Sequence, residues 1–346
     1  MTHKTIIGVD LAKHVFQVCM VNHKGTLKTN TTVTRGKLLA LIARQPPALI
    51  VMEACGGAHD WARRFRAVGH EVRLLAPQYV VPFRHGQKND PNDALALTEA
   101  GLRPSIPSVP VKSVEQQDIQ ALHRVRERLV KNRTALVNQL RGLLLEYGIV
   151  IPQGLYRLRK RLPGILEDAD NGLSFAFRDL LQSLAQELRT IDASIAAVTR
   201  RLTRISRELE ACQRLREMEG SGPLNATALV AALGTGHDFR HGRQVAAWLG
   251  LVPRQHSSGG KTRLAGISKR GNSYLRRLLI HGARAVVSRA RTKTDAASVW
   301  IRQLVARVGM NKACVAVANK MARIAWALLS TGERYRTPGV QQAQSA

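Results

Sequence analysis

Acidic and aromatic residues are scarce in this chain of 346 residues. It has 24 Asp and Glu against 53 Lys and Arg, a net charge of +29, and 4% aromatic residues. The positive charge is spread over most of the chain, which favours a polyanionic partner, nucleic acid first, because each phosphate contact releases counterions. With so few aromatic residues, base stacking is inconspicuous, so phosphate contacts should dominate binding.

The spacing of the cysteines and the lack of long apolar runs argue against a zinc protein, a disulfide-stabilised protein and a membrane protein. Cys19, Cys55, Cys212 and Cys314 form no Cys-x-x-Cys pair, so neither a zinc site nor a disulfide framework is indicated, and a reducing compartment is expected. No run approaches the roughly 18 apolar residues of a membrane span, and the N-terminus lacks a signal-peptide layout. The sequence therefore predicts a cytoplasmic protein that engages no membrane.

The chain is longer than one compact core usually needs, and its pattern changes along its length. Three expected strands at 5–10, 14–22 and 26–33 are followed by a helix that Thr34 would cap, and the order continues as βββαβαβα. We expect an α/β domain at 1–110, a helical coiled-coil region at 111–215, an all-α C-terminal domain at 216–336 and a disordered tail at 337–346.

The middle part carries a heptad pattern. Between positions 177 and 209, apolar residues follow one another at alternating intervals of four and three, which is typical of a coiled coil. Packing alone would explain this stripe without any ligand role. We expect an antiparallel helical hairpin or a dimerising arm, with the chain broken between its two helical stretches by Pro152, Pro163 and Gly164.

Four of the few acids occupy special positions. Asp10 ends the first expected strand, Glu53 ends a buried strand at 48–54, and Asp90 and Asp93 open a helix. Capping alone would explain the last pair, with Asp90 as N-cap and Asp93 at N3. The first and fourth strands would be neighbours, however, so all four carboxylates could converge, and such a cluster needs a cation. Two Mg²⁺ ions, or Mn²⁺, are the expected occupants.

The stretch "HSSGGKTR" at 256–263 combines serine, glycine and positive charge. Ser257 and Ser258 are candidate nucleophiles, which need a base, a metal or positive charge for activation, and His256 is a candidate base. The alternative is a flexible polar loop between helices. The expected nucleic-acid contacts are Lys88 in the N-terminal part and, around the serines, Arg254, Lys261, Arg263, Lys269, Arg270, Arg276 and Arg277.

Two motif groups together resemble one known family. "GVD" on the first strand, "MEA" on the fourth and "KNDPNDA" at the last helix look like a ribonuclease H-like domain of the RuvC type with an Asp-Glu-Asp-Asp set. With "PRQHSSGGKTRLAGISKRGNSYLRR", they resemble the DEDD insertion-sequence transposases, whose relatives include the Piv-type DNA invertases. The chain is similar to the branch that works with a structured bridge RNA encoded by the element itself.

The resemblance implies a site, a mechanism and partners. The nucleophile falls on Ser257, with Ser258 adjacent, and the metal-binding set falls on Asp10, Glu53, Asp90 and Asp93. Ser257 would attack a DNA phosphodiester to give a covalent phosphoserine, with Mg²⁺ activating the attack, and strand exchange would follow without ATP. The implied partners are DNA and a guide RNA, in a homo-oligomer, dimer to tetramer, with a composite site between subunits. The resemblance also implies a prokaryotic, nucleoid-associated protein.

Other interpretations stay open. A Mg²⁺-dependent nuclease of the Holliday-junction type would use activated water and leave the Ser-Ser-Gly-Gly stretch unexplained. A non-catalytic nucleic-acid-binding scaffold would explain the charge but not the four acids. Gly220 and Gly222 could present backbone N–H groups to a phosphate or form a packing joint. Ser221 between them departs from the apolar residue common in the family.

Overall fold

The chain folds into two compact units. The computed structural model describes residues 5–336. The units are Met1–Ser113 and Val114–Ala346, so the predicted coiled-coil region and C-terminal domain fall in the same unit. The finer division into four segments stays a prediction, and the tail predicted at 337–346 lies outside the described residues.

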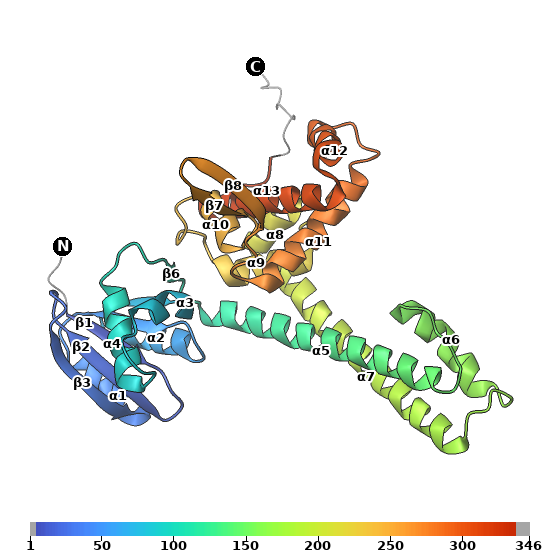
Figure 1. Ribbon diagram of the computed structural model, residues 1–346, viewed down its shortest axis with the longest axis horizontal. Helices are drawn as coiled ribbons and strands as arrows, with labels where there is room; N and C mark the ends of the chain where they lie inside the picture. Colours follow the sequence, from blue (N-terminus) through green and yellow to red (C-terminus); the bar gives the residue numbers. More distant parts are fainter. Residues whose placement is uncertain (1–4, 337–346) are drawn as a thin grey trace. The chain divides into compact units, whose positions relative to one another are not determined.

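The first unit is built on a six-stranded mixed sheet (Figure 1) of order β3-β2-β1-β4-β5-β6. Its first three strands pair antiparallel, and β1 pairs parallel with β4, as predicted. Helix α3, a 3-10 turn and the two-residue strand β6 were not predicted, because such short elements carry no periodicity. The elements are β1 Ile6–Asp10, β2 Val15–Val21, β3 Leu27–Thr34, α1 Arg35–Ala43, β4 Leu49–Glu53, α2 Ala58–Ala67, β5 Glu71–Leu75, α3 Pro77–Val80, the 3-10 turn Val81–Phe83, α4 Asp90–Gly101 and β6 Ser108–Val109.

Helices cover both faces of this sheet. In β1, Ile7 and Val9 belong to the core shared with α1 and α2, whereas Ile6 belongs to the core shared with α4. Gly8 lies on the α4 face, where an added Cβ would stand 2.4 Å from the Ala94 carbonyl oxygen. Because successive strand residues alternate between faces, Asp10 also lies on the α4 face. Glycine at position 8 therefore lets α4 approach β1 closely.

The second unit is mainly helical. Two long helices, α5 and α7, pack side by side (Figure 1), and they run antiparallel because Arg126 bonds Thr199 while Arg133 bonds Asp192. The predicted helical pair is therefore present, while its role in dimerisation stays a prediction. The helices are α5 Val114–Leu145, α6 Leu155–Glu167, α7 Phe175–Glu208, α8 Glu210–Glu217, α9 Pro223–Leu233, α10 Gly242–Trp248, α11 Ser273–Arg289, α12 Ala296–Val308 and α13 Met310–Thr331.

The connection between α5 and α7 differs from the prediction. Pro163 and Gly164 do not break the chain, because α6 continues through both of them. A proline inside a helix removes one backbone hydrogen bond, but here Leu158, Leu162 and Ile165 are buried in the core shared with α5 and α7. Tertiary packing therefore outweighs the local cost of the proline.

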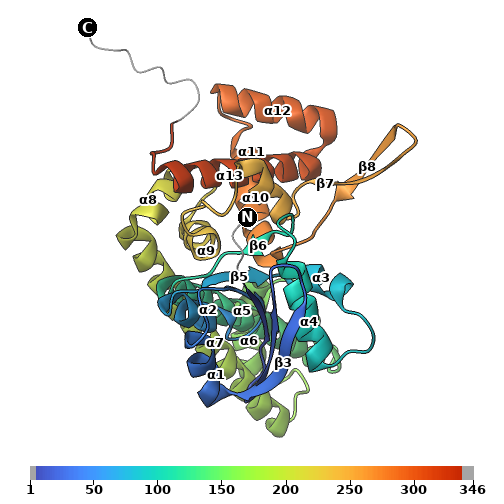
Figure 2. The same ribbon diagram turned by 90° about the vertical axis from the view of Figure 1, so that its left-hand side faces the viewer.

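The prediction of an all-α C-terminal part was wrong. Strands β7 (Pro253–Ser258) and β8 (Lys261–Ile267) form an antiparallel hairpin, which projects from the helices in Figure 2. Gly259 and Gly260 form its turn with φ of +55° and +74°. Two successive residues with left-handed backbone conformation are what a two-residue hairpin turn requires. The strands escaped prediction because nearly all their residues are exposed and lack an apolar face.

One helix is apolar enough to resemble a membrane span by composition. Helix α13 has 22 residues, and half of its most apolar window is buried inside the protein. Ala318, Ala322 and Ala325 are fully buried in the helical core. Core helices pass the same test of length and composition, so this feature is weak support for a membrane span.

Candidate active site

The strand acids meet at one end of the sheet. In the parallel pair of β1 and β4, Val9 lies opposite Met52, so the next residues, Asp10 and Glu53, continue the same register. Val51, two residues before Glu53, is the side chain that a Cβ at Gly101 of α4 would strike. Alternation therefore places Glu53, like Asp10, on the face that α4 covers.

The start of α4 brings the other two acids. The N-cap is Asn89, whose side-chain oxygen accepts a hydrogen bond from the Asn92 backbone N–H at 2.9 Å. Asp90 is therefore the first helical residue and not the cap, which corrects the predicted capping by one position. The amide takes the capping place because Asn89 has the extended backbone that this place requires. Both Asp90 and Asp93 lie in the first turn.

A ladder of polar side chains links the sheet to this helix start. Gln17 lies opposite Asp10, and its Nε2 donates to Asn30 Oδ1 at 2.6 Å. The Asn30 amide in turn donates to the Pro91 carbonyl oxygen at 3.0 Å. Sequence reasoning missed both residues, and the only signal was a polar side chain in otherwise apolar β2. The ladder ties the first turn of α4 to the strand that carries Asp10.

The pKa values show that the acids share one electrostatic environment. Burial first, and then the charges of Asp93, Asp90 and Glu53, raise the pKa of Asp10 from 3.8 to about 6. Burial also raises the pKa of Glu53, as does the charge of Asp93, while Lys88 opposes them. A raised pKa means that the ionised form is disfavoured, and a cation close to the carboxylates would stabilise that form. The donor set therefore has the charge and the hard oxygen chemistry that suit a divalent metal ion.

A protein cation already contacts one of these acids. Arg84 Nη1 lies 3.2 Å from Asp93 Oδ1, a contact that sequence reasoning missed because the two belong to different elements. Within residues 5–336, no three His, Cys, Asp or Glu side chains form a group that could hold a metal ion as they stand. The Asp90 and Asp93 carboxylates therefore stand at the same end of the sheet as Asp10 and Glu53 without forming such a group, and metal binding by the four acids stays a prediction.

The two candidate serines lie on opposite faces of the β7–β8 hairpin. Ser257 pairs with Thr262 and Ser258 with Lys261, and successive side chains of a strand point to opposite faces. His256 pairs with Arg263, so it shares a face with Ser258 and not with Ser257. All of these residues are exposed. The face of Ser257 instead carries Gln255, whose Nε2 donates to Ser257 Oγ at 2.9 Å.

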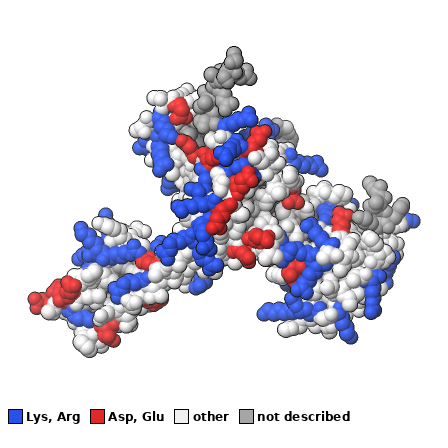
Figure 3. All heavy atoms as spheres, turned by 180° about the vertical axis from the view of Figure 1, so that it is seen from behind, with Lys and Arg blue, Asp and Glu red and all other residues white. Residues whose placement is uncertain are grey.

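The predicted nucleic-acid contacts divide into exposed and engaged groups. Arg276 donates to the carbonyl oxygens of Leu249 and Arg270, and Arg277 Nη2 lies 2.7 Å from Glu127 Oε1. In Figure 3, Lys and Arg are spread over the visible surface and occupy more of it than Asp and Glu, which form smaller groups between them. All of the predicted contacts except Arg276 are exposed, namely Lys88, Arg254, Lys261, Arg263, Lys269, Arg270 and also Arg277, which keeps its bond to Glu127.

The Gly-Ser-Gly segment at 220–222 packs closely against helix α11. Gly220 has φ of +80°, and an added Cβ would lie 2.8 Å from the Gly282 carbonyl oxygen on α11. Gly222 is the N-cap of α9. Ser221 Oγ is buried without a hydrogen-bond partner. These contacts support the packing-joint interpretation, and the phosphate-binding role stays a prediction.

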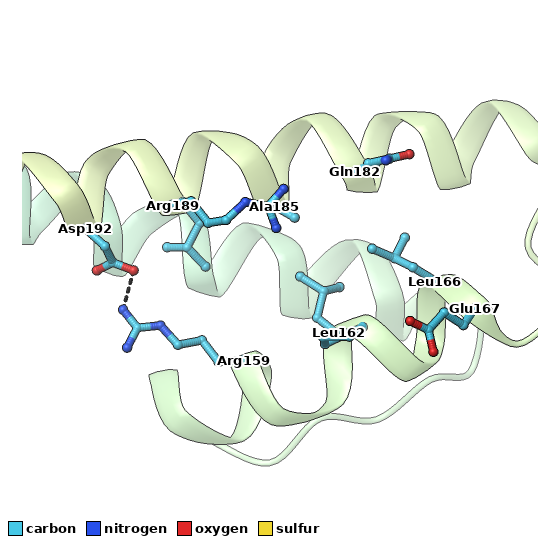
Figure 4. A pocket seen from close by; sticks show the side chains of 10 residues that line it. Arg159, Leu162, Leu166, Glu167, Gln182, Ala185, Arg189 and Asp192 are labelled. Carbon is cyan, nitrogen blue, oxygen red and sulfur yellow. Dashed lines mark hydrogen bonds and ion pairs between the residues drawn. The ribbon is translucent and has the colours of Figure 1, made fainter.

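A cavity of about 470 Å³ lies between α6 and α7 (Figure 4). Its lining includes Leu162, Leu166 and Leu188, and Arg159 bonds Asp192 at one end. None of the predicted site residues lines it. The cavity therefore lies between the facing sides of α6 and α7, apart from the predicted site residues.

Comparison with known proteins identifies the chain's relatives. The model described as "Transposase IS116/IS110/IS902 family" matches residues 212–298, and a DEDD transposase model matches residues 7–149. The chain is 49% identical to "Probable family 20 transposase" of Pseudomonas aeruginosa, over 96% of this chain and 98% of the relative.

Two further relatives bear on the expected resemblance. The "Transposase for insertion sequence element IS1111A" of Coxiella burnetii is 46% identical over 96% of this chain and 91% of its own. The "Pilin gene-inverting protein" of Moraxella lacunata is more distant, at 23% over 74% of each chain. The fold of the first unit is compatible with the predicted RuvC-like DEDD domain. The chain therefore belongs to the IS116/IS110/IS902 family of insertion-sequence transposases, which are DNA recombination enzymes.

Proposed function

We propose that this transposase cuts and rejoins DNA through a covalent phosphoserine at Ser257. The observation that carries the proposal is the position of Ser257 at the tip of an exposed hairpin, where Gly259 and Gly260 add no side chains beside it. A phosphodiester backbone can approach such a tip without a steric barrier. Exposed Arg254, Lys269 and Arg270 near the base of the hairpin favour the approach of a polyanion.

The proposed reaction conserves the phosphodiester bond energy. Ser257 Oγ forms a bond to phosphorus while the bond to one deoxyribose oxygen breaks, and the hydroxyl proton leaves as the departing oxygen gains one. In the second step, a deoxyribose hydroxyl of the other strand attacks the phosphoserine, and Ser257 Oγ regains a proton. Neither step needs an oxidant, a reductant or ATP.

Asp10, Glu53, Asp90 and Asp93 are the residues that would hold Mg²⁺ or Mn²⁺ in this proposal. A divalent ion there supplies Lewis-acid stabilisation of charge on the phosphodiester oxygens. The raised pKa values of Asp10 and Glu53, caused first by burial and then by neighbouring carboxylates, support this assignment, because a cation stabilises the ionised forms. Arg84 neutralises part of the same charge through its contact with Asp93.

We also propose that the partners are DNA and a structured guide RNA, bound by a homo-oligomer. The net charge of +29 and the 4% aromatic content support recognition of phosphate backbones more than stacking of single bases. A paired RNA would then supply the sequence reading that such a surface lacks.

The test is a search for a protein–DNA adduct that survives denaturation. The protein is incubated with Mg²⁺, labelled DNA spanning an element end, and the flanking non-coding RNA. We expect an adduct that Ser257→Ala abolishes and Ser258→Ala retains, because the two serines face opposite sides of the hairpin. Omission of the RNA should abolish the adduct if the RNA guides the reaction.

The acids are tested in the same assay. Asp10→Ala is expected to abolish the adduct while leaving DNA binding intact, since the acids repel phosphates unless a cation is bound. Nicked DNA without an adduct would favour the nuclease that uses activated water and would refute the phosphoserine mechanism.

A further inference from the structure

The two faces of the β7–β8 hairpin differ in chemistry. The register places Ser257 opposite Thr262, and Gln255 opposite Leu264, so one face carries four uncharged side chains. The opposite face carries His256, Ser258, Lys261 and Arg263. Lys261 and Arg263 therefore lie on the face opposite to Ser257. Activation of the Ser257 hydroxyl needs a partner on its own face.

Gln255 is that partner within the hairpin. It precedes Ser257 by two residues on the same strand, which separates their backbones by about 7 Å. The long amide side chain spans this distance, and its Nε2 lies 2.9 Å from Ser257 Oγ. Within residues 5–336, Gln255 is the side chain that hydrogen-bonds this hydroxyl.

This hydrogen bond has a chemical consequence. Donation from Nε2 occupies one lone pair of Oγ and fixes the side-chain rotamer, while the hydroxyl hydrogen stays free to leave. As Oγ loses its proton and gains negative charge, the N–H group stabilises that charge. The same contact stabilises the charge that returns to Oγ when the serine departs in the second step. A hydrogen bond to the attacking atom thus serves both halves of the reaction.

We propose that Gln255 is a positioning residue, which orients the Ser257 hydroxyl and stabilises charge on its oxygen. The opposite face, with Lys261 and Arg263, holds a different phosphate of the nucleic-acid backbone. The inference rests on the proposed role of Ser257 as nucleophile. It deepens that role by separating orientation from phosphate binding on the two faces of one hairpin.

The experiment measures the rate of adduct formation in preformed protein–nucleic acid complexes, together with DNA affinity. Gln255→Leu keeps the apolar stem and removes the donor, and we expect adduct formation to slow by about 10- to 100-fold with little change in affinity. The matched control is Thr262→Val, which removes a hydroxyl from the same face, keeps the strand-favouring branched shape, and should leave the rate within about twofold of wild type.

A pH profile separates positioning from hairpin stability. Gln255→Glu should form the adduct slowly near neutral pH, because an ionised carboxylate cannot donate a hydrogen bond. Its rate should recover relative to wild type as the pH falls toward about 4 and the carboxyl gains a proton. A purely structural role predicts no such recovery.

Three results would overturn the inference. Gln255→Leu could form the adduct at the wild-type rate, Thr262→Val could slow it equally, or Gln255→Glu could show no recovery at low pH. If wild type forms no adduct at all, the phosphoserine mechanism itself fails and the role of Gln255 fails with it. A wild-type adduct with an unaffected Gln255→Leu variant refutes the positioning role alone.

Discussion

A buried histidine should make the second unit sensitive to acid. His123 on α5 is 4% exposed, and its Nε2 lies 3.0 Å from Thr227 Oγ1 while its Nδ1 lies 2.8 Å from the Tyr274 hydroxyl. Thr227 Oγ1 already donates to the Pro223 carbonyl oxygen at 2.7 Å, so it can only accept from the ring. Nε2 therefore carries the hydrogen, and Nδ1 accepts from Tyr274. The network fits the neutral ring.

The magnitude follows from the pKa of this ring. Burial, and to a smaller extent the charge of Arg126, lower the pKa of His123 from 6.5 to about 4. Between pH 6.5 and pH 4, His123 binds a proton in the unfolded chain but not in the folded one. The stability of the fold is therefore highest above about pH 6.5 and decreases as the pH falls toward 4. The full loss is about 3 kcal/mol, and about 2 kcal/mol is lost by pH 5.

The assay is denaturant unfolding of the full chain at about pH 7.5 and about pH 5, followed by far-UV circular dichroism, which the helices of the second unit dominate. Wild type should lose about 2 kcal/mol more than His123→Gln between these conditions, because glutamine bears no titrating proton. Tyr274→Phe should cost about 1–2 kcal/mol at the higher pH by leaving Nδ1 without its donor. Equal pH dependence in wild type and His123→Gln would refute the buried neutral histidine.

Three further predictions concern the active site. Because the pKa of Asp10 is raised, its ionised form destabilises the native state above about pH 6. Asp10→Asn removes this charge and should increase the free energy of unfolding at neutral pH by about 1 kcal/mol, a value already reduced for solvent screening. Thermal unfolding checks this, and a lower melting temperature would contradict it. Gly8→Ala should destabilise the first unit by about 1–3 kcal/mol, because its Cβ would meet the Ala94 carbonyl oxygen at 2.4 Å. Gly36→Ala in α1, where nothing lies within 4 Å of an added Cβ, serves as the control, and its stability should not fall. The double variant Lys261→Ala, Arg263→Ala should weaken DNA binding and reduce the dependence of DNA affinity on salt concentration by about two counterions. It should not slow adduct formation once the protein is saturated with DNA. An unchanged salt slope would remove this face from the binding surface.

Much of the first unit was predictable because its local patterns agree with its tertiary structure. The order of strands and helices, the adjacency of β1 and β4, and the helix that Asp90 and Asp93 open all followed from periodicity and turn residues. Arg84 was not predictable as the partner of Asp93, because the contact joins a turn to a helix start. The β7–β8 hairpin was missed since its strands bury no apolar face.

The sequence by itself determined the chemical inventory: a strongly basic chain, four acids at strand and helix ends, and two adjacent serines followed by two glycines. Only the tertiary structure decided how these groups face one another. Strand pairing placed Asp10 and Glu53 beneath α4, and hairpin register put Ser257 and Ser258 on opposite faces. The physical reason is that residue types fix which bonds are possible, whereas backbone pairing across distant positions fixes which of them form.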